Sequence, residues 1–229
     1  TLQYHLDTSF NVNVYIGKNK GQATSVDLSK SSLKNAIESA CLIAKYTQED
    51  PFNGLAPSER MAWDNPNLDL YYTWNLDAKQ SIEIAKECEQ IALEQSEINN
   101  SDGAELSSFE GESVYANSNG LIANLKSSRH SLYCSLIAKR ADEMQTAYEY
   151  SVAIDSTDLT APLKIGLEAA RLAQEKLGSR HLSPQKCPII FTSRQSSGIF
   201  SQLLGALSGS RQYKKTSFLL ESLGNKVLP

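Results

Sequence analysis

Strand-forming sequence between residues 99 and 153, with helical sequence on both sides, gives the clearest indication of fold. It begins at the Asn-Ser-Asp-Gly of residues 100–103, and Asn119 with Gly120 is typical of a turn between antiparallel strands. Four strands are expected, ending near Asn117, near Lys126, at Ala138 and at Ala153, the third beginning at Ser131. The sequence therefore predicts an α+β fold in which helices pack on an antiparallel β meander.

Three segments show the apolar spacing of helices and begin at a capping signal. Ser29 can cap the first helix, Asp77 with Gln80 forms a capping-box pattern before the second, and Thr160 can cap the third. Gly178 stands where a left-handed residue ends the third helix. The expected buried faces are Leu33, Ile37, Ala40, Cys41 and Ala44; then Ile84, Ala85, Cys88, Ile91 and Ala92; then Leu163, Leu167, Ala170 and Leu177.

We expect three domains or parts of domains. They are the end of an N-terminal α/β domain at residues 1–28, a central helix and β-meander domain at 29–182, and the start of a second, β-rich C-terminal domain at 183–229. The first part is a hairpin of residues 10–16 and 22–28. The last opens with an apolar strand at 188–192 and a helix from Ser197 to about Leu207. Because the chain opens without Met in a hairpin-like region, we expect it to be a piece of a longer product.

Composition and charge argue against two classes of partner. The chain has 229 residues, with 22 Lys plus Arg against 26 Asp plus Glu, so its net charge is −4. A mildly acidic chain without a long basic run lacks the charge pattern of most nucleic-acid-binding proteins. No run of about 18 apolar residues is present to cross a bilayer, and no signal peptide is recognisable. We therefore expect a cytoplasmic protein with no membrane partner.

No local motif assigns a catalytic or metal-binding residue. The cysteines, which we expect to be buried small hydrophobic residues, are Cys41, Cys88, Cys134 and Cys187. None has a second cysteine about three residues away, as zinc ribbons and redox motifs require. The histidines are His5, His130 and His181, and none lies within helical or hairpin reach of another. The Gly-x-Ser-x-Gly elbow, the dinucleotide fingerprint and the phosphate loop are all absent.

A small basic cluster follows a turn rich in Gly and Ser near the end of the chain. Arg211, Lys214 and Lys215 lie beside Tyr213 in the sequence. Such a cluster can bind a carboxylate of a partner protein, or it can be an ordinary solvated rim. Both interpretations remain open.

Eight stretches, in order along the chain, resemble the PmbA (TldE) branch of the TldD/PmbA family, proteins often labelled modulators of DNA gyrase. They are residues 21–56, 67–74, 100–103, 116–120, 128–132, 144–145, 176–180 and 204–219. The resemblance runs essentially end to end. It implies a longer protein with an additional N-terminal portion and most of a β-rich C-terminal domain.

The resemblance also concerns zinc. In the TldD branch, the strand and helix that match Pro188 to Leu207 carry His-Glu-x-x-x-His, in which two imidazoles hold a zinc ion and the carboxylate activates its water. That pattern falls on Ser201, Gln202 and Ala206 here. A hydroxyl and an alkyl group do not replace imidazole ligands, and a neutral Gln takes no proton from water. The resemblance therefore implies no catalytic residue, metal or cofactor in this chain, with zinc in a TldD-type partner.

The same helix has the pattern of a packing surface. Ile199, Leu203, Leu204 and Leu207 supply an apolar face, which suits a subunit interface and an interior core helix equally well. The glycines of this region permit close backbone approach. The candidate interface residues are Gly205, Gly209, Arg211, Tyr213, Lys214 and Lys215.

These observations favour one function and leave two alternatives. The favoured function is that of a non-catalytic subunit of a TldD/PmbA-type zinc metalloprotease, which binds a TldD-like protein and acts on peptides or unfolded polypeptides; a homodimer is a further option. The first alternative is an independent hydrolase with a non-zinc site, for which mutation of His130 or Cys134 is the test. The second is a regulatory protein associated with gyrase or DNA.

Overall fold

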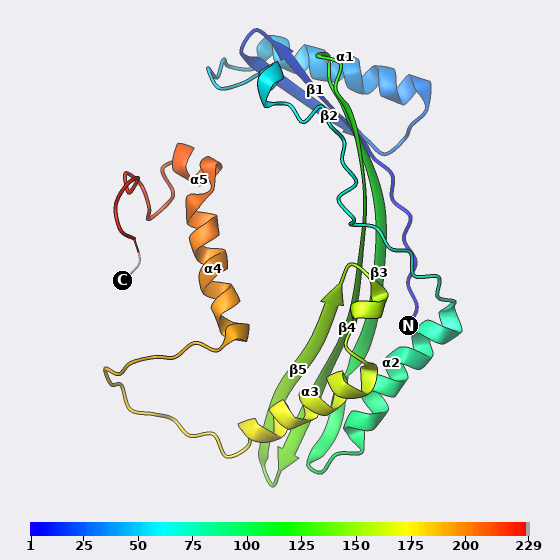
Figure 1. Cartoon of the computed structure of the whole chain (residues 1–229), viewed down its shortest axis with the longest axis vertical. Coiled ribbons are helices and arrows are strands. Elements are labelled where there is room, and N and C mark those ends of the chain that lie inside the picture. Colours follow the sequence, from blue (N-terminus) through cyan, green and yellow to red (C-terminus); the bar gives the residue numbers. More distant parts are fainter. Residues whose placement is uncertain (228–229) are drawn as a thin grey trace. The chain divides into compact units, whose positions relative to one another are not determined.

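A computed structural model describes residues 1–227, and its helices and antiparallel sheets confirm the predicted α+β class (Figure 1). The chain divides into two units, residues 1–179 and 180–229, which we describe separately. No helix within residues 1–227 is both long and apolar enough to span a bilayer. The predicted domain boundaries remain predictions.

The first unit opens with a hairpin covered by a helix. Strand β1 (Phe10–Ile16) pairs antiparallel with β2 (Asn19–Ser25), and helix α1 (Lys30–Tyr46) packs on both. Ser29 caps α1 as predicted, because its Oγ accepts the backbone N–H of Ser32 at 3.3 Å. A short 3-10 turn, η1 (Ser58–Arg60), follows in the irregular segment after α1.

The buried face of α1 is made of alanines. Ala36, Ala40 and Ala44 are buried, whereas Ile37, which the spacing places on this face, is 44% exposed. The helix lies so close to the hairpin that a Cβ atom added at Gly21 would be 1.9 Å from the carbonyl oxygen of Ala40. Because only small side chains fit at this distance, the close approach selects the alanine face.

Strands β3 (Ile98–Ala116), β4 (Ile122–Arg140) and β5 (Glu143–Ala153) form one antiparallel sheet in that order. The prediction of four strands is wrong, because the segments expected to end near Lys126 and to begin at Ser131 are one continuous strand. β5 pairs with β4 only from His130 onward, so the first part of the β3–β4 hairpin extends beyond β5 (Figure 1).

Two buried polar residues explain why the sequence pattern did not predict the continuity of β4. Ser128 and His130 interrupt the hydrophobic pattern, yet they keep their register opposite Glu110 and Ser108 of β3. Both are buried and hydrogen-bonded to groups outside β4. A strand can contain buried polar side chains when they are hydrogen-bonded. In the sequence, however, such polar residues look like those of a loop.

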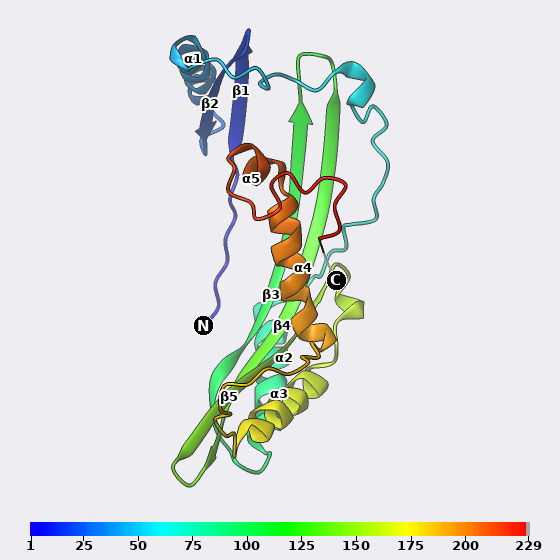
Figure 2. The same ribbon diagram turned by 90° about the vertical axis from the view of Figure 1, so that its left-hand side faces the viewer.

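Helices α2 (Ala78–Leu93) and α3 (Pro162–Lys176) lie side by side on one face of the sheet (Figure 2). The predicted capping box is present: Asp77 Oδ1 accepts the Gln80 N–H at 2.7 Å, and Gln80 Oε1 accepts the Asp77 N–H at 3.0 Å. The core between helices and sheet consists of Cys88, Ala92, Ile98, Leu132, Cys134, Leu136, Ala138, Ala147, Ile165, Ala169, Ala170, Ala173 and Leu177.

Helix α3 differs from the prediction at its start and in its buried face. Thr160 is not the cap; Ala161 holds that position, and Pro162 opens the helix where a backbone N–H is not needed. Leu163 is 43% exposed, because the buried face is the small-residue side that crosses α2. At that crossing a Cβ atom on Gly166 would lie 2.2 Å from the Cys88 carbonyl oxygen. The turn η2 (Ser156–Asp158) precedes this helix. Gly178 follows the helix and has a positive φ of 80°, in agreement with the predicted left-handed residue.

The second unit contains α4 (Ser193–Leu207) and the short helix α5 (Gly209–Tyr213). The strand expected at 188–192 is wrong, since those residues form neither helix nor strand. Ile189 and Ile190 are 70% and 94% exposed there. A strand needs a hydrogen-bonded neighbour, and no residue of 180–227 pairs with this segment. Helix α4 begins at Ser193, four residues before the predicted start at Ser197.

Candidate functional site

The positions that match the zinc motif of the TldD branch lie on α4. Ser201 and Gln202 are exposed on this helix, whereas Ala206 is buried near its end. The carbonyl oxygen of Ala206 accepts hydrogen bonds from Ser217 Oγ at 2.7 Å and from Gln212 Nε2 at 2.8 Å. Position 206 is thus enclosed by the chain that follows α4, in a space filled by a methyl group.

The chemistry of these positions is not that of a metal centre. A hydroxyl, a carboxamide and a methyl group offer neither an imidazole ligand nor a carboxylate base. Within residues 1–227, no three side chains of His, Cys, Asp or Glu are grouped so that they could hold a metal ion.

The predicted interface residues gather at the end of α4 and on the turn of chain that follows it. Gly205 lies against the guanidinium of Arg211, whose nitrogen would be 3.3 Å from a Cβ atom at that glycine. The small core beneath this turn is formed by Ala206, Ser217 and Leu219. Gly209, Arg211, Tyr213, Lys214 and Lys215 are exposed around it. The structure therefore brings the six residues to one region, where the side chain of Arg211 fills the space left by Gly205.

His130 lies where β4 meets the segment of residues 70–74. Its Nε2 is 3.0 Å from the Tyr72 carbonyl oxygen, and its Nδ1 is 2.9 Å from Ser108 Oγ. Because a carbonyl oxygen only accepts, Nε2 carries the proton and Nδ1 accepts from the Ser108 hydroxyl in the neutral ring. Trp74 packs edge-on against the imidazole, with 5.3 Å between the ring centroids, and His130 is fully buried. Neither nitrogen is free to act as a catalytic base.

Ser128 and Glu110 hold the same segment on the sheet. Ser128 donates its N–H to the Leu70 carbonyl at 2.8 Å, and its Oγ accepts the Tyr72 N–H at 2.9 Å. Glu110 accepts the Tyr71 hydroxyl at 2.9 Å, and this hydrogen bond raises the pKa of Tyr71. Residues 70–72 thus occupy the strand position beside β4 where β5 has ended.

The cysteines of α2 and β4 are core residues. Cys88 and Cys134 are fully buried, and a hydrogen bond between them together with burial raises the pKa of the Cys88 thiol. A thiol that stays protonated is a poor nucleophile, which applies to Cys88. The same hydrogen bond lowers the pKa of Cys134, but this thiol is fully buried and out of reach of a substrate. The expectation of buried cysteines is right for this pair, but Cys41 is half-buried and Cys187 is exposed in the segment without secondary structure.

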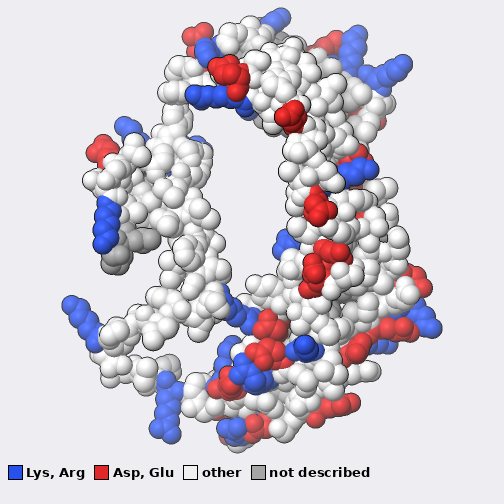
Figure 3. All heavy atoms as spheres, viewed as in Figure 1, with Lys and Arg blue, Asp and Glu red and all other residues white. Residues whose placement is uncertain are grey.

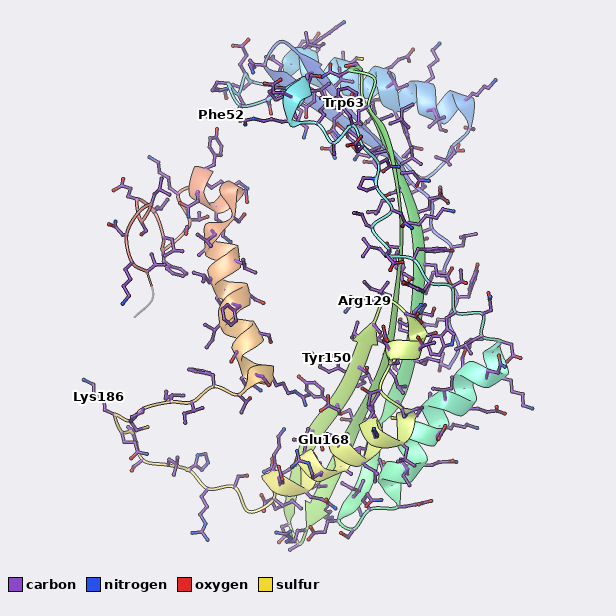
Figure 4. The ribbon with its side chains drawn as sticks, viewed as in Figure 1. Phe52, Trp63, Arg129, Tyr150, Glu168 and Lys186 are labelled. Atoms are coloured by element: carbon purple, nitrogen blue, oxygen red, sulfur yellow. The ribbon has the colours of Figure 1, made fainter. Side chains whose placement is uncertain are left out.

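The face of the sheet opposite α2 and α3 carries a shallow concavity of about 570 Å³. Its lining residues, which we call the outer-face site, are Glu105, Ser107, Phe109, Ser127, Ser128, Arg129 and Ser131. Arg129 projects from β4 on the side away from α2, as does Tyr150 from β5 (Figure 4). Glu105 and Arg129 are exposed, and neither forms an ion pair within residues 1–227.

Sequence reasoning missed the outer-face site because it placed Arg129 in a connection between two strands. The alternation of Ser127, Arg129 and Ser131 with buried Ser128 and His130 is the signal that could have found it. Along one continuous strand, odd-numbered residues share a face. The register then sets Arg129 opposite Phe109 and Ser131 opposite Ser107.

Comparison with known proteins relates the chain to one family. Residues 71–177 match the PmbA/TldA metallopeptidase central domain. The whole chain is 40% identical to the "Metalloprotease PmbA homolog" of Haemophilus influenzae. The chain is therefore similar, over its whole length, to proteins of the TldD/PmbA family. It spans about half (51%) of the length of that relative.

Two solved structures of the family share the fold. A crystal structure from Bacteroides thetaiotaomicron, described as a candidate modulator of DNA gyrase, is 26% identical with a TM-score of 0.85 over 95% of this chain and 50% of its own. The TldE structure from Thermococcus kodakarensis is 20% identical, with a TM-score of 0.62 over 92% of this chain and 47% of its own, and shows the fold alone. This chain therefore shares its fold with parts of both proteins.

Proposed function

We propose that this chain acts as a non-catalytic subunit of a TldD/PmbA-type zinc metalloprotease that processes or degrades peptides and unfolded polypeptides. The proposal rests on the residues of α4 that match the zinc motif of the TldD branch, which are Ser201, Gln202 and Ala206 instead of His, Glu and His. Ala206 is buried beneath the chain that contacts it, so an imidazole there requires the following turn to move. A TldD-like partner supplies the zinc ion and its activated water.

The surface of α4 supports a role in association. Phe200, Leu204 and Leu207 are 60%, 67% and 56% exposed. Exposed apolar side chains grouped on one helix mark an interaction surface more often than an ordinary solvated one. The basic turn with Arg211, Lys214 and Lys215 follows directly, and it can pair with carboxylates of the partner at the rim of the interface.

The test is reconstitution with a TldD-type protein. We expect the two proteins to co-purify, and we expect zinc-dependent cleavage of an unfolded polypeptide only when both are present. Removal of zinc by a chelator should abolish cleavage without separating the proteins. Cleavage by this chain without the partner contradicts the proposal.

A matched pair of substitutions in α4 tests the interface. Leu204→Glu places a charge on the apolar face and should weaken co-purification. Gln195→Glu introduces the same carboxylate at an exposed position on the opposite side of α4, nine residues before Leu204, and should leave it intact. Equal effects of both substitutions would contradict a specific role for the apolar face.

The two alternative functions have less support. The imidazole of His130 is fully hydrogen-bonded and Cys134 is buried, so neither offers a reactive group to an independent hydrolase. Cationic and anionic side chains are intermixed on the face shown in Figure 3, rather than forming the basic surface that direct DNA binding requires.

A further inference from the structure

The outer-face site carries one positive and one negative side chain at its two ends. Arg129 lies opposite Phe109 in the register, and Glu105 lies opposite Tyr133. Residues 129 and 133 are four positions apart on β4, so the two charged positions are about 13 Å apart along the strands at about 3.3 Å per residue. This separation is too large for a direct ion pair, and both charges remain available to a ligand.

Hydroxyl groups occupy the floor between the two charges. Ser107 and Ser131 are register partners at the centre of the site, and Ser127 lies beyond Arg129. Within residues 1–227, the hydroxyls of Ser107, Ser127 and Ser131 have no hydrogen-bond partner in the protein. Hydroxyls both donate and accept, so they match the alternating N–H and C=O groups of an extended peptide.

Phe109 leaves this floor open because its ring leans the other way. A Cβ atom on Gly111 would lie 2.7 Å from Cζ of Phe109, so the ring covers the glycine instead of Ser107. Tyr133, which is 37% exposed, stands at the end near Glu105 and contacts the ring of Tyr148 at 5.5 Å. The site is thus a polar concavity with an aromatic side chain toward each end.

We propose that the outer-face site binds a short peptide of about four residues with free termini, its carboxylate on Arg129 and its ammonium group on Glu105. An extended chain covers about 3.4 Å per residue, so four residues span the separation of the two charges. A guanidinium binds a carboxylate through two parallel hydrogen bonds. The idea rests on the proposed function, because cleavage of polypeptides produces short peptides with both termini charged.

The experiment uses the ¹⁵N-labelled chain alone and tetra-alanine as the probe. We expect titration to shift the amide signals of Ser107, Phe109 and Ser131. Capping the probe as N-acetyl-tetra-alanine-amide should weaken binding, and di-alanine should bind more weakly than tetra-alanine because it reaches only one charge. Arg129→Gln and Glu105→Gln should each weaken binding about fivefold, as expected for an exposed charge-assisted contact.

Two further variants make the result specific. Lys86→Gln removes an exposed positive charge from α2 and should leave the affinity unchanged. The double variant Arg129→Glu with Glu105→Lys reverses the site and should bind tetra-alanine in the opposite direction, recovering most of the affinity lost in either single change. No shift at these amides, or equal binding of the capped peptide, overturns the inference. Because no partner protein is present, that result leaves the proposed association with a TldD-type protein untouched.

Discussion

His130 joins β3, β4 and the segment of residues 70–74 through both nitrogens of a fully buried ring. His130→Phe retains an aromatic ring but leaves the Tyr72 carbonyl and the Ser108 hydroxyl without their partner. We expect the free energy of unfolding to fall by about 2 kcal/mol or more, because an unsatisfied buried polar group costs about 1–3 kcal/mol. Urea unfolding followed by circular dichroism measures this change.

The control for that substitution is His5→Phe, which alters an exposed histidine and should leave the unfolding midpoint unchanged. If His130→Phe unfolds like the wild type, the hydrogen bonds of the ring contribute nothing to stability, and the independent-hydrolase alternative regains support.

Glu143 fixes the end of α3 by its charge. Both carboxylate oxygens accept the Gly178 N–H at 2.9 Å, and this bond, followed by that from Gln145, lowers the pKa of Glu143. A folded-state pKa below the unfolded value stabilises the fold above the unfolded pKa, and this stabilisation is lost as pH falls through the folded pKa. Glu143→Gln should therefore reduce the loss of stability below about pH 4.5, the ordinary value of a Glu.

Thermal unfolding at several pH values measures the effect of Glu143→Gln. Asp142→Asn is the matched control, because this neighbouring exposed carboxylate has no hydrogen bond or ion pair within the described residues. Identical pH profiles for wild type and Glu143→Gln would show that the bond to Gly178 is absent in solution.

At the scale of elements, close approach between backbones decides which helix face is buried. Gly166 of α3 and Gly198 of α4 are both helical glycines, and in isolation Ala is favoured over Gly in a helix by about 1 kcal/mol. Gly166→Ala should nevertheless destabilise the first unit by about 2 kcal/mol, because its Cβ meets the Cys88 carbonyl oxygen and overpacking of this kind costs about 1–3 kcal/mol.

Gly198→Ala provides the comparison, since no atom lies within 4 Å of a Cβ placed there. This substitution should leave the unfolding transition of the first unit unchanged. Chemical denaturation of both variants, monitored by circular dichroism, measures the difference. Equal stability of the two variants would contradict the close contact of α2 with α3.

For the whole molecule, the segment after the first unit is the expected site of proteolysis. Residues 180–192 have no secondary structure, and Arg180 and Lys186 are exposed within it. Limited trypsin digestion should cut first at these two residues and leave a resistant fragment ending near residue 180, identified by intact mass. Arg180→Gln with Lys186→Gln should remove the early cleavage. An initial cut at Arg60 instead would show that the segment after α1 opens more readily.

The parts of the structure that the sequence predicts correctly depend on neighbouring residues. The Ser29 cap, the Asp77–Gln80 capping box and the positive φ of Gly178 all involve groups within a few positions of each other. The resemblance to the TldD/PmbA family likewise depends on the residues themselves and not on their contacts.

What the amino-acid sequence determined by itself is therefore the α+β class, the helices of the first unit with the caps of α1 and α2, the resemblance to the TldD/PmbA family, and the absence of zinc-ligand side chains at Ser201, Gln202 and Ala206. The tertiary structure alone decided that β4 is continuous, that alanines line the buried face of α1, and that Glu105 and Arg129 share one face. The physical reason is distance along the chain. The two hydrogen-bond partners of His130, Tyr72 and Ser108, are 58 and 22 residues away, and no local pattern predicts a hydrogen bond or a close backbone contact between such distant residues.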